Sequence, residues 1–175
     1  MKFNITDEES HKAKIPHEIF LTNLIANHIL WFIASLGMVK DTPQLLALVP
    51  IVSFSMLAFT LWRANKSKQV DSWFVMCHWQ IAAARSRIFI YMLLFMLTIA
   101  LLGWIGYTYL GMMEVAVYAI FGGIGILPVM VTVLALIIME SDMLHQASLH
   151  KVPKSAVEKF QSPQMPEVIE QPATA

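Results

Sequence analysis

Residues 88–107 read IFIYMLLFMLTIALLGWIGY, a run without a charged side chain. A bilayer core is crossed by about 20 apolar residues in an α-helix, and this stretch supplies that length. Further apolar stretches predict spans over about 19–38, 44–62 and 115–139. The chain is 14% charged, whereas soluble domains are about 25% charged. We therefore predict an all-α integral membrane protein, a bundle of four transmembrane helices.

The four spans sort the basic residues of the chain. Of the 12 lysines and arginines, Lys40 alone falls on one side of the predicted membrane. The others lie on the opposite side, and they are Lys2, Lys12, Lys14, Arg63, Lys66, Lys68, Arg85, Arg87, Lys151, Lys154 and Lys159. Loops rich in Lys and Arg stay on the cytoplasmic side. We therefore predict that both chain ends are cytoplasmic and that the protein lies in a bacterial-type cytoplasmic (inner) membrane.

The regions outside the spans are predicted from composition. Residues 1–18 are polar and mixed in charge, with Pro16 near their end, and form a cytoplasmic segment ahead of a four-span membrane domain over 19–151. Their acidic residues are unlike those of a cleavable leader, so we expect the first span to stay in place. Residues 152–175 contain several prolines and little apolar periodicity, which predicts a disordered cytoplasmic tail.

The connection between the second and third spans carries a helical pattern over about 70–86. Apolar residues at i, i+3, i+4 and i+7 spacings share one face, and they are Val70, Trp73, Phe74, Cys77, Ile81 and Ala84. We predict an amphipathic helix at the cytoplasmic membrane surface or, alternatively, an unbroken extension of the third span. Residues suited to anchoring on anionic lipid headgroups are Arg63, Lys66, Lys68, Trp73, Trp79, Arg85 and Arg87.

The first span contains three polar residues. Asn23 and Asn27 are four residues apart and share a helix face, and His28 lies about 100° around the helix from Asn27. Polar side chains hydrogen-bond neighbouring helices in membranes, which is the first interpretation. A ligand or quinone site and an incidental lipid-facing placement are the alternatives. The other histidines lie at other predicted depths, which disfavours a haem held by two histidines of one chain.

Small residues recur in the third and fourth spans, and they are Gly103, Gly106, Ala119, Gly122, Gly123 and Gly125. Helix backbones approach closely where side chains are small, so these positions predict helix–helix contact. The contact is either between the third and fourth spans or with a helix of another protein. Pro128 removes a backbone N–H and crowds the preceding turn, which predicts a kink in the fourth span.

The sequence carries no catalytic or cofactor motif that we recognise. No Asp, Glu, Lys or Arg lies within the predicted spans, which disfavours an ion-coupled transporter acting alone. Glu140 and Asp142 mark the exit of the fourth span to the cytoplasm. Cys77 and His78 lack the spacing of a metal site. His17 is expected outside the membrane core, and the histidines expected to be solvated or interfacial are His78, His145 and His150.

These observations favour a non-enzymatic role. The first hypothesis is an accessory or assembly subunit of a larger membrane complex, whose partners are membrane lipids and either other membrane subunits or a second copy of the chain. The alternative is a protein that binds a lipid or small molecule, or a transport component, using the face of Asn23, Asn27 and His28. A weaker alternative is a redox subunit associated with haem or quinone. No metal, cofactor or nucleic acid is predicted as a ligand.

Overall fold

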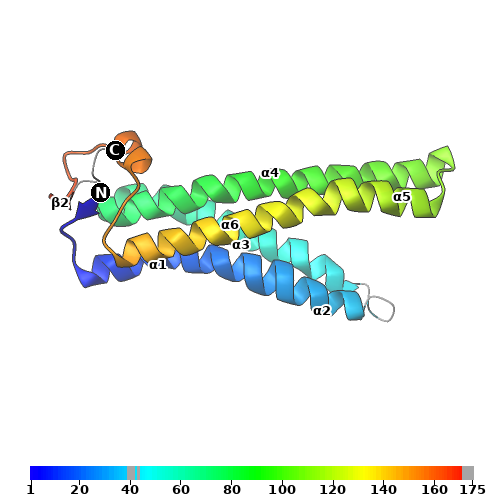
Figure 1. Ribbon diagram of the computed structural model, residues 1–175, viewed down its shortest axis with the longest axis horizontal. Helices are drawn as coiled ribbons and strands as arrows, with labels where there is room; N and C mark the ends of the chain where they lie inside the picture. The colour runs from blue at the N-terminus through cyan, green and yellow to red at the C-terminus, as the bar shows by residue number, and fades with distance from the viewer. Residues whose placement is uncertain (39–41, 43, 171–175) are drawn as a thin grey trace. The chain divides into compact units, whose positions relative to one another are not determined.

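The computed structural model describes residues 1–38, 42 and 44–170 (Figure 1). In this part of the chain, four helical stretches are long and apolar enough to cross a membrane: Asp7–Ser35, Leu48–Val70, Trp73–Leu110 and Glu114–Ser148. The prediction of a helical chain with four potential membrane spans is confirmed. Lys40, predicted on the side opposite the other basic residues, lies outside the described residues.

The chain divides into two compact units. The first unit comprises Met1–Ser86 together with the chain from Ile137 onward, and the second comprises Arg87–Leu136. Helix α4 (Trp73–Leu110) and helix α6 (Leu127–Ser148) each contribute residues to both units. Each unit therefore has its own packing, and each is described in turn.

The first unit begins with a helical stretch that is longer than predicted. It comprises α1 (Asp7–Thr22), the π-helix η1 (Asn23–Trp31) and α2 (Phe32–Gly37). Thr6 caps α1 because its side chain accepts the Glu9 N–H while the Glu9 carboxylate accepts the Thr6 N–H, a reciprocal capping box. The helix thus starts well before Pro16, which lies inside α1 and does not mark a boundary as predicted.

The next two helices form a hairpin with a very short turn. Helix α3 (Gln44–Val70) continues beyond the predicted end of the second span, and α4 begins two residues later at Trp73. A separate surface helix over 70–86 is therefore not present, and the alternative prediction of an unbroken extension of the third span is correct. The reason is local: α4 contains no proline, and its first glycine is Gly103.

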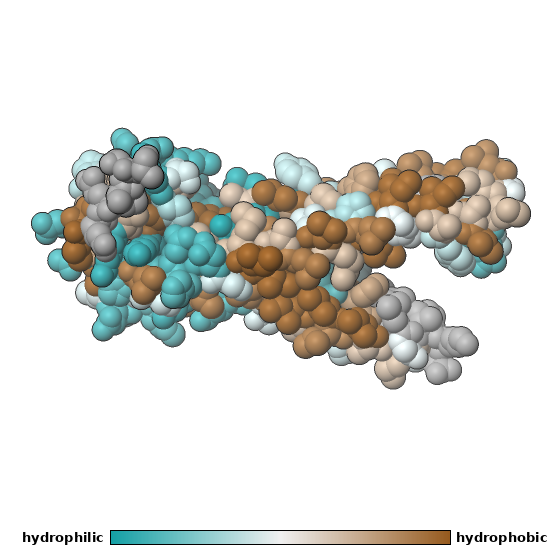
Figure 2. All heavy atoms as spheres, viewed as in Figure 1, coloured by the Kyte–Doolittle hydropathy of each residue, from teal (hydrophilic) through white to brown (hydrophobic). Residues whose placement is uncertain are grey.

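Buried apolar residues from both ends of the chain and from the α3–α4 hairpin form one core, which we call the terminal cap: Phe3, Ala13, Ala64, Trp73, Phe74, Val75, Cys77, Trp79, Ala83, Ala147, Val152, Ala156 and Val157. Figure 2 shows hydrophilic residues gathered on the outside of this end of the first unit, whereas apolar residues cover its η1 and α2 region. The cap buries Trp73 and Trp79 to 3% exposure each. The anchoring prediction required both indoles to lie at the surface, and neither does.

The segment after Val152 differs from the disordered tail predicted by composition. It contains α7 (Lys154–Lys159) and strand β2 (Val168–Glu170), which pairs antiparallel with β1 (Lys2–Phe3). Ala156 and Val157 are buried in the cap, and the indole N–H of Trp73 donates to the Phe160 carbonyl at 2.5 Å. A few well-spaced apolar side chains fix this segment although its average composition is polar. Residues 171–175 lie outside the described chain.

The second unit is a helical hairpin. The later part of α4 is followed by a turn with Gly111 at φ 65°, then by α5 (Glu114–Phe121), the π-helix η2 (Gly122–Ile126) and the start of α6. Gly125 is buried, and a Cβ there would lie 3.2 Å from Cγ2 of Ile99 on α4. The π-helix ends directly before Leu127 and Pro128, where a kink is predicted.

Candidate functional site

The polar residues predicted in the first span lie together in η1 and face α3. The Asn23 amide donates to the Ser53 hydroxyl at 3.2 Å, and the Asn27 amide donates to the Val49 carbonyl at 2.9 Å. The Asn27 amide also reaches the Asn23 side-chain oxygen at 3.2 Å. All of these asparagine contacts are buried. In this geometry the amides act as hydrogen-bonding contacts between the first and second spans.

The π-helical form of η1 is part of this arrangement. The N–H of Phe32 bonds the Asn27 carbonyl five residues earlier, which is the widened spacing of a π-helix. Nδ1 of His28 lies 3.1 Å from the Asn23 carbonyl, again five residues earlier. A shallow apolar groove of about 340 Å³ lies beside Asn27 and is lined by Thr22, Ala26, Asn27, Trp31, Leu48, Val52 and Met56. π-Helical turns are frequent at functional sites.

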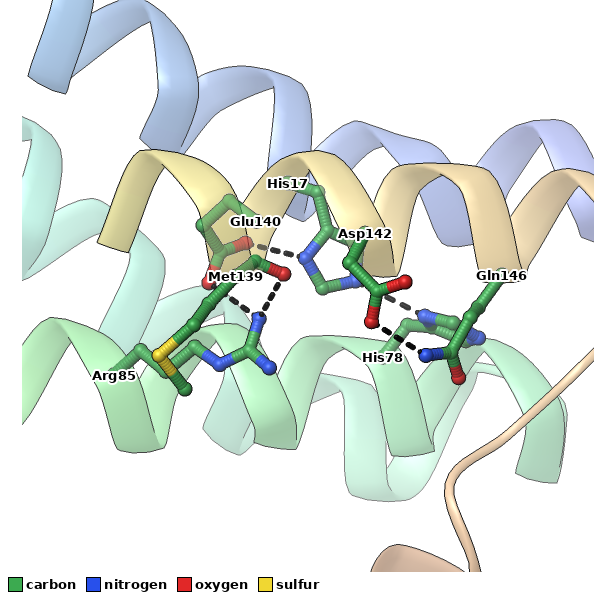
Figure 3. Close-up of polar contacts among 7 residues, drawn as sticks. All are labelled: His17, His78, Arg85, Met139, Glu140, Asp142 and Gln146. Atoms are coloured by element: carbon green, nitrogen blue, oxygen red, sulfur yellow. Dashed lines mark hydrogen bonds and ion pairs between the residues drawn. The ribbon is translucent and has the colours of Figure 1, made fainter. Parts of the chain in front are cut away.

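A second polar group, which sequence reasoning missed, is buried in the first unit (Figure 3). His17 comes from α1, His78 and Arg85 from α4, and Glu140 from α6; we call these four residues the His–Glu–Arg cluster. Nδ1 of His17 lies 2.5 Å from Oε2 of Glu140. Nε2 of His17 lies 3.0 Å from Nδ1 of His78. Both histidines and Glu140 are completely buried, so the expectation of a solvated or interfacial side chain is wrong for His78.

Arg85 provides the counter-charge of the cluster. Its Nη1 donates to Oε1 of Glu140 at 3.0 Å and to the Met139 carbonyl at 2.9 Å. A buried carboxylate is tolerated only when it is paired and hydrogen-bonded, and Glu140 has one partner on each oxygen. The neighbouring Asp142 is exposed and accepts from Gln146 on the same helix at 2.6 Å. Glu140 therefore joins helices, whereas Asp142 does not.

The cluster could have been detected from helical spacing. On α6, Glu140 falls on the same stripe as the buried Val133, Leu136, Met143 and Ala147. On α1, His17 lies between Ala13 and Phe20, and on α4, His78 lies between Phe74 and Ala82, all of them buried. A polar residue at an apolar stripe position is the signal. The partners are far apart in sequence, so the spacing shows the position but not the contact.

The residues predicted as lipid anchors divide into two groups. Arg63 binds Asp71 with two hydrogen bonds, at 2.7 and 3.0 Å, and its guanidinium lies 4.9 Å from the centre of the Trp79 ring. Arg85 belongs to the His–Glu–Arg cluster. These two side chains therefore stabilise helix contacts within the first unit. The exposed residues of the set are Lys66, Lys68 and Arg87.

The glycines of the second unit also divide into two groups. A Cβ on Gly106 would lie 2.7 Å from the Met112 sulfur, and one on Gly125 would crowd Ile99. At Gly122 and Gly123 an added Cβ would meet nothing within 4 Å. Gly106 and Gly125 therefore serve packing within the chain, whereas Gly122 and Gly123 leave open space.

A groove of about 680 Å³ lies in the second unit. It is lined by apolar and aromatic residues together with one acidic residue, Glu114, and the others are Met96, Ala100, Gly103, Trp104, Tyr107, Val117, Tyr118, Gly122 and Ile126. The Glu114 carboxylate lies beside the Tyr118 hydroxyl. Aromatic faces and a carboxylate attract cations. The groove therefore combines an apolar lining with a carboxylate and aromatic rings suited to a positively charged group.

Comparison of the chain with family models, with curated proteins and with solved structures gives no match. In the described part of the chain, no group of three or more His, Cys, Asp or Glu residues is arranged to hold a metal ion. Glu140, His17 and His78 are linked in series, each bonded to the next.

Proposed function

We propose that this chain is a non-catalytic accessory or assembly subunit of a larger membrane complex, and that the second unit binds the partner. The observation that carries the proposal is the open space at Gly122 and Gly123, in a hairpin where Gly106 and Gly125 are instead closely packed within the chain. Ala119 and Gly123 are four residues apart, the spacing at which small residues allow a second helix to approach closely. The partner is thus a membrane helix packed against α5 and η2.

The proposed orientation follows from the charges on the first unit. With Lys40 aside, the basic residues lie in the first unit, except for Arg87 at the start of the second. Basic regions are retained in the cytoplasm. We therefore place the terminal cap in the cytoplasm, with the protein in a bacterial-type cytoplasmic membrane, and the partner-binding hairpin within the bilayer.

The test is co-purification of a tagged chain from its native cells in mild detergent, with the partners identified by mass spectrometry. Gly123→Leu should abolish recovery of a stoichiometric partner and leave the thermal unfolding of the chain unchanged, because its position is open. Val115→Leu, at a residue that is 77% exposed, is the matched control and should retain the partner. Isolation of the unmodified chain as a monomer without a partner would refute the proposal.

The second candidate is a protein that binds a lipid or small molecule. The Asn23 and Asn27 amides, one predicted site for such a ligand, are engaged with α3, so the observation that favours this candidate is the groove in the second unit. Its Glu114 and aromatic rings suit an amphiphile with a cationic headgroup. An absorption spectrum of the purified protein tests the weaker haem or quinone hypothesis, which predicts a visible band.

Native mass spectrometry tests this second candidate by measuring whether the protein retains an added amphiphile. Protein incubated with a long-chain trimethylammonium amphiphile should retain it, and a long-chain sulfate should not be retained. Glu114→Gln should weaken retention, whereas Glu158→Gln, on α7 and far along the chain, should not. Equal retention of the cationic and anionic amphiphiles would argue against a specific site.

A further inference from the structure

We propose that the His–Glu–Arg cluster is a proton-binding site whose occupancy controls the packing of α1 against α4 and α6 in the first unit. The inference is independent of the proposed function, because it concerns residues that are absent from the second unit. Its ligand is a single proton, taken up by the histidine pair. The geometry that leads to this inference is a chain of titratable groups in contact, contributed by three helices and completely buried.

The ion pair between Arg85 and Glu140 determines where the hydrogens of the cluster lie. An ionised carboxylate can only accept hydrogen bonds, and an arginine stays protonated at all physiological pH values. Glu140 pairs with the Arg85 guanidinium as a carboxylate, so Nδ1 of His17 must carry the hydrogen that it donates to Glu140. The ring of His17 is thereby fixed in one tautomer, with Nε2 left to face His78.

The contact between the two imidazoles determines where a further proton can bind. Two ring nitrogens 3.0 Å apart share one hydrogen, so in the neutral pair Nδ1 of His78 donates to Nε2 of His17. Nε2 of His78 then has a lone pair and no hydrogen. That atom is buried with no hydrogen-bond partner at bonding geometry among the described residues, while a backbone interaction with Lys151 favours the protonated form of the same ring. Nε2 of His78 is therefore the site at which a further proton can bind.

The charge balance of the cluster makes a further proton costly. Arg85 and Glu140 cancel one another, so the cluster with a neutral histidine pair carries no net charge. One additional proton leaves a positive charge that is buried and uncompensated, which is costly. Among the described residues, Glu140 is the acid in ion-pair contact with either cluster histidine, and its charge is already balanced. Separation of α1 from α4 and α6 would let water reach His17 and His78 and relieve the cost.

The charged groups on the surrounding elements do not change this balance. On α1, Glu18 is exposed and Lys14 is half-buried. On α3 and at the α3–α4 turn, Arg63 and Asp71 are paired with each other. On α6, Asp142 is exposed and engaged with Gln146. The neutral neighbour on α4, Cys77, is buried in the terminal cap.

The cluster lies close to the predicted membrane boundary on three helices. His17 lies just before the predicted first span, Arg85 just before the third, and Glu140 just after the fourth. The contact thus joins three helices at the predicted boundary between the membrane and the terminal cap. Protonation there loosens the cap while the spans remain inserted.

The sign of the pH dependence follows from linkage. An open form, in which the histidines contact water, binds a proton at the ordinary histidine value of about pH 6.5, whereas the closed form resists it. The open form therefore holds more protons than the closed form, and the closed form loses stability as the pH falls below that value. Above about pH 7 the pair is neutral and the closed packing is complete.

Cys77 is a built-in reporter of this opening. It is the sole cysteine of the chain, it is buried, and it is adjacent to His78 within the cap. The experiment is the labelling rate of Cys77 by a dipyridyl disulfide in the detergent-solubilised full chain, divided at each pH by the rate in the denatured chain. This ratio removes the intrinsic pH dependence of the thiol reaction. We expect the protection of Cys77 to fall about tenfold between pH 7.5 and pH 5, as uptake of one proton allows.

Two variants distinguish proton binding at His78 from a general destabilisation of the protein by acid. In His78→Asn the side-chain amide can still donate to His17 but cannot bind a proton, so protection of Cys77 should stay constant over the same pH range. His145→Asn, at an exposed histidine of α6, should behave as the unmodified protein does. Unchanged protection in the unmodified protein, or an unchanged acid response in His78→Asn, would overturn the proposal.

A second measurement needs no substitution, and it keeps the proposal testable if His78→Asn does not fold. Deuterium exchange at the imidazole C2 position, measured by mass spectrometry, reports the protonation of each histidine in the unmodified chain. His78 should gain its proton at the pH at which Cys77 becomes reactive, and exchange at the exposed His145 is the internal reference. A Cys77 transition that occurs without protonation of His78 would overturn the proposal.

Discussion

The two units of this protein share helices α4 and α6, but the helices within each unit are fixed by a different kind of contact. In the first unit, α4 and α6 contribute Arg85 and Glu140 to a buried ion pair. In the second unit, α4 and the π-helix before α6 meet where Gly125 lies against Ile99. An ion pair is directional but costs desolvation, whereas a glycine contact depends on close packing alone. The comparison teaches that one helix can be fixed by charge over one part of its length and by shape over another.

The largest effect on stability is expected from removal of the Glu140 carboxylate. Glu140→Ala leaves Arg85 and His17 without their buried partner, and we expect the free energy of unfolding to fall by about 3–5 kcal/mol. Chemical unfolding of the detergent-solubilised chain measures this loss. Asp142→Ala, two residues away and exposed, should change stability by no more than about 0.5 kcal/mol. Similar losses in the two variants would show that Glu140 has no special role.

The corresponding change in the second unit is smaller. Gly125→Leu inserts a side chain where even a Cβ lies 3.2 Å from Ile99, and overpacking of this kind costs about 1–3 kcal/mol. Gly123→Leu should leave the unfolding midpoint unchanged, because its neighbourhood is open. The same unfolding assay compares the pair. If both leucine variants unfold like the unmodified chain, the packing role of Gly125 is wrong.

The asparagine contacts provide an intermediate case, polar but uncharged. Asn23→Ala combined with Asn27→Ala removes the hydrogen bonds to Ser53 and Val49 on α3. Hydrogen bonds between membrane helices contribute about 0.6–2 kcal/mol each, so the double variant should lose about 1–3 kcal/mol in a detergent stability assay. Asn4→Ala, at an exposed residue ahead of α1, is the control. Unchanged stability of the double variant would count against the interhelical interpretation.

The smallest effect is expected at the hairpin turn of the first unit. Arg63→Lys keeps the charge but loses the two-point bond to Asp71 and the stacking on Trp79. Partly exposed pairs contribute up to about 1 kcal/mol, so the unfolding midpoint should fall only slightly. Lys66→Arg at an exposed site should have no measurable effect. A loss as large as that of Glu140→Ala would mean that the turn, rather than the cluster, holds the unit together.

The helices of this protein could be predicted from the sequence because length and hydropathy are local properties. The run 88–107 and the other apolar stretches gave the number of potential spans, and helical periodicity gave the buried face of α4 around Phe74 and Cys77. The early start of α1 could also have been read from Thr6 and Glu9, whose spacing is that of a capping box.

The terminal cap and the His–Glu–Arg cluster could not be predicted in the same way. His17, His78 and Glu140 look like ordinary boundary residues until three helices bring them into contact. The pairing of β1 with β2 likewise joins residues near opposite ends of the chain. Such contacts depend on tertiary packing, which local patterns in a single sequence do not reveal. The prediction of a disordered tail used average composition, which gave no weight to the individual apolar residues Ala156 and Val157 that fix this segment in the cap.

The pairing of β1 with β2 also sets the order in which the molecule can be completed. Phe3 emerges early from the ribosome, but its strand partner Val168 is made only after every span has been synthesised. During that interval the apolar side chain of Phe3 has no finished cavity to occupy. Closure of the cap is therefore a late event in biogenesis, and it takes place only in chains that have been translated to the end of β2. A chain terminated before β2 would leave this surface exposed to proteolysis, so the cap distinguishes chains made through β2 from shorter ones.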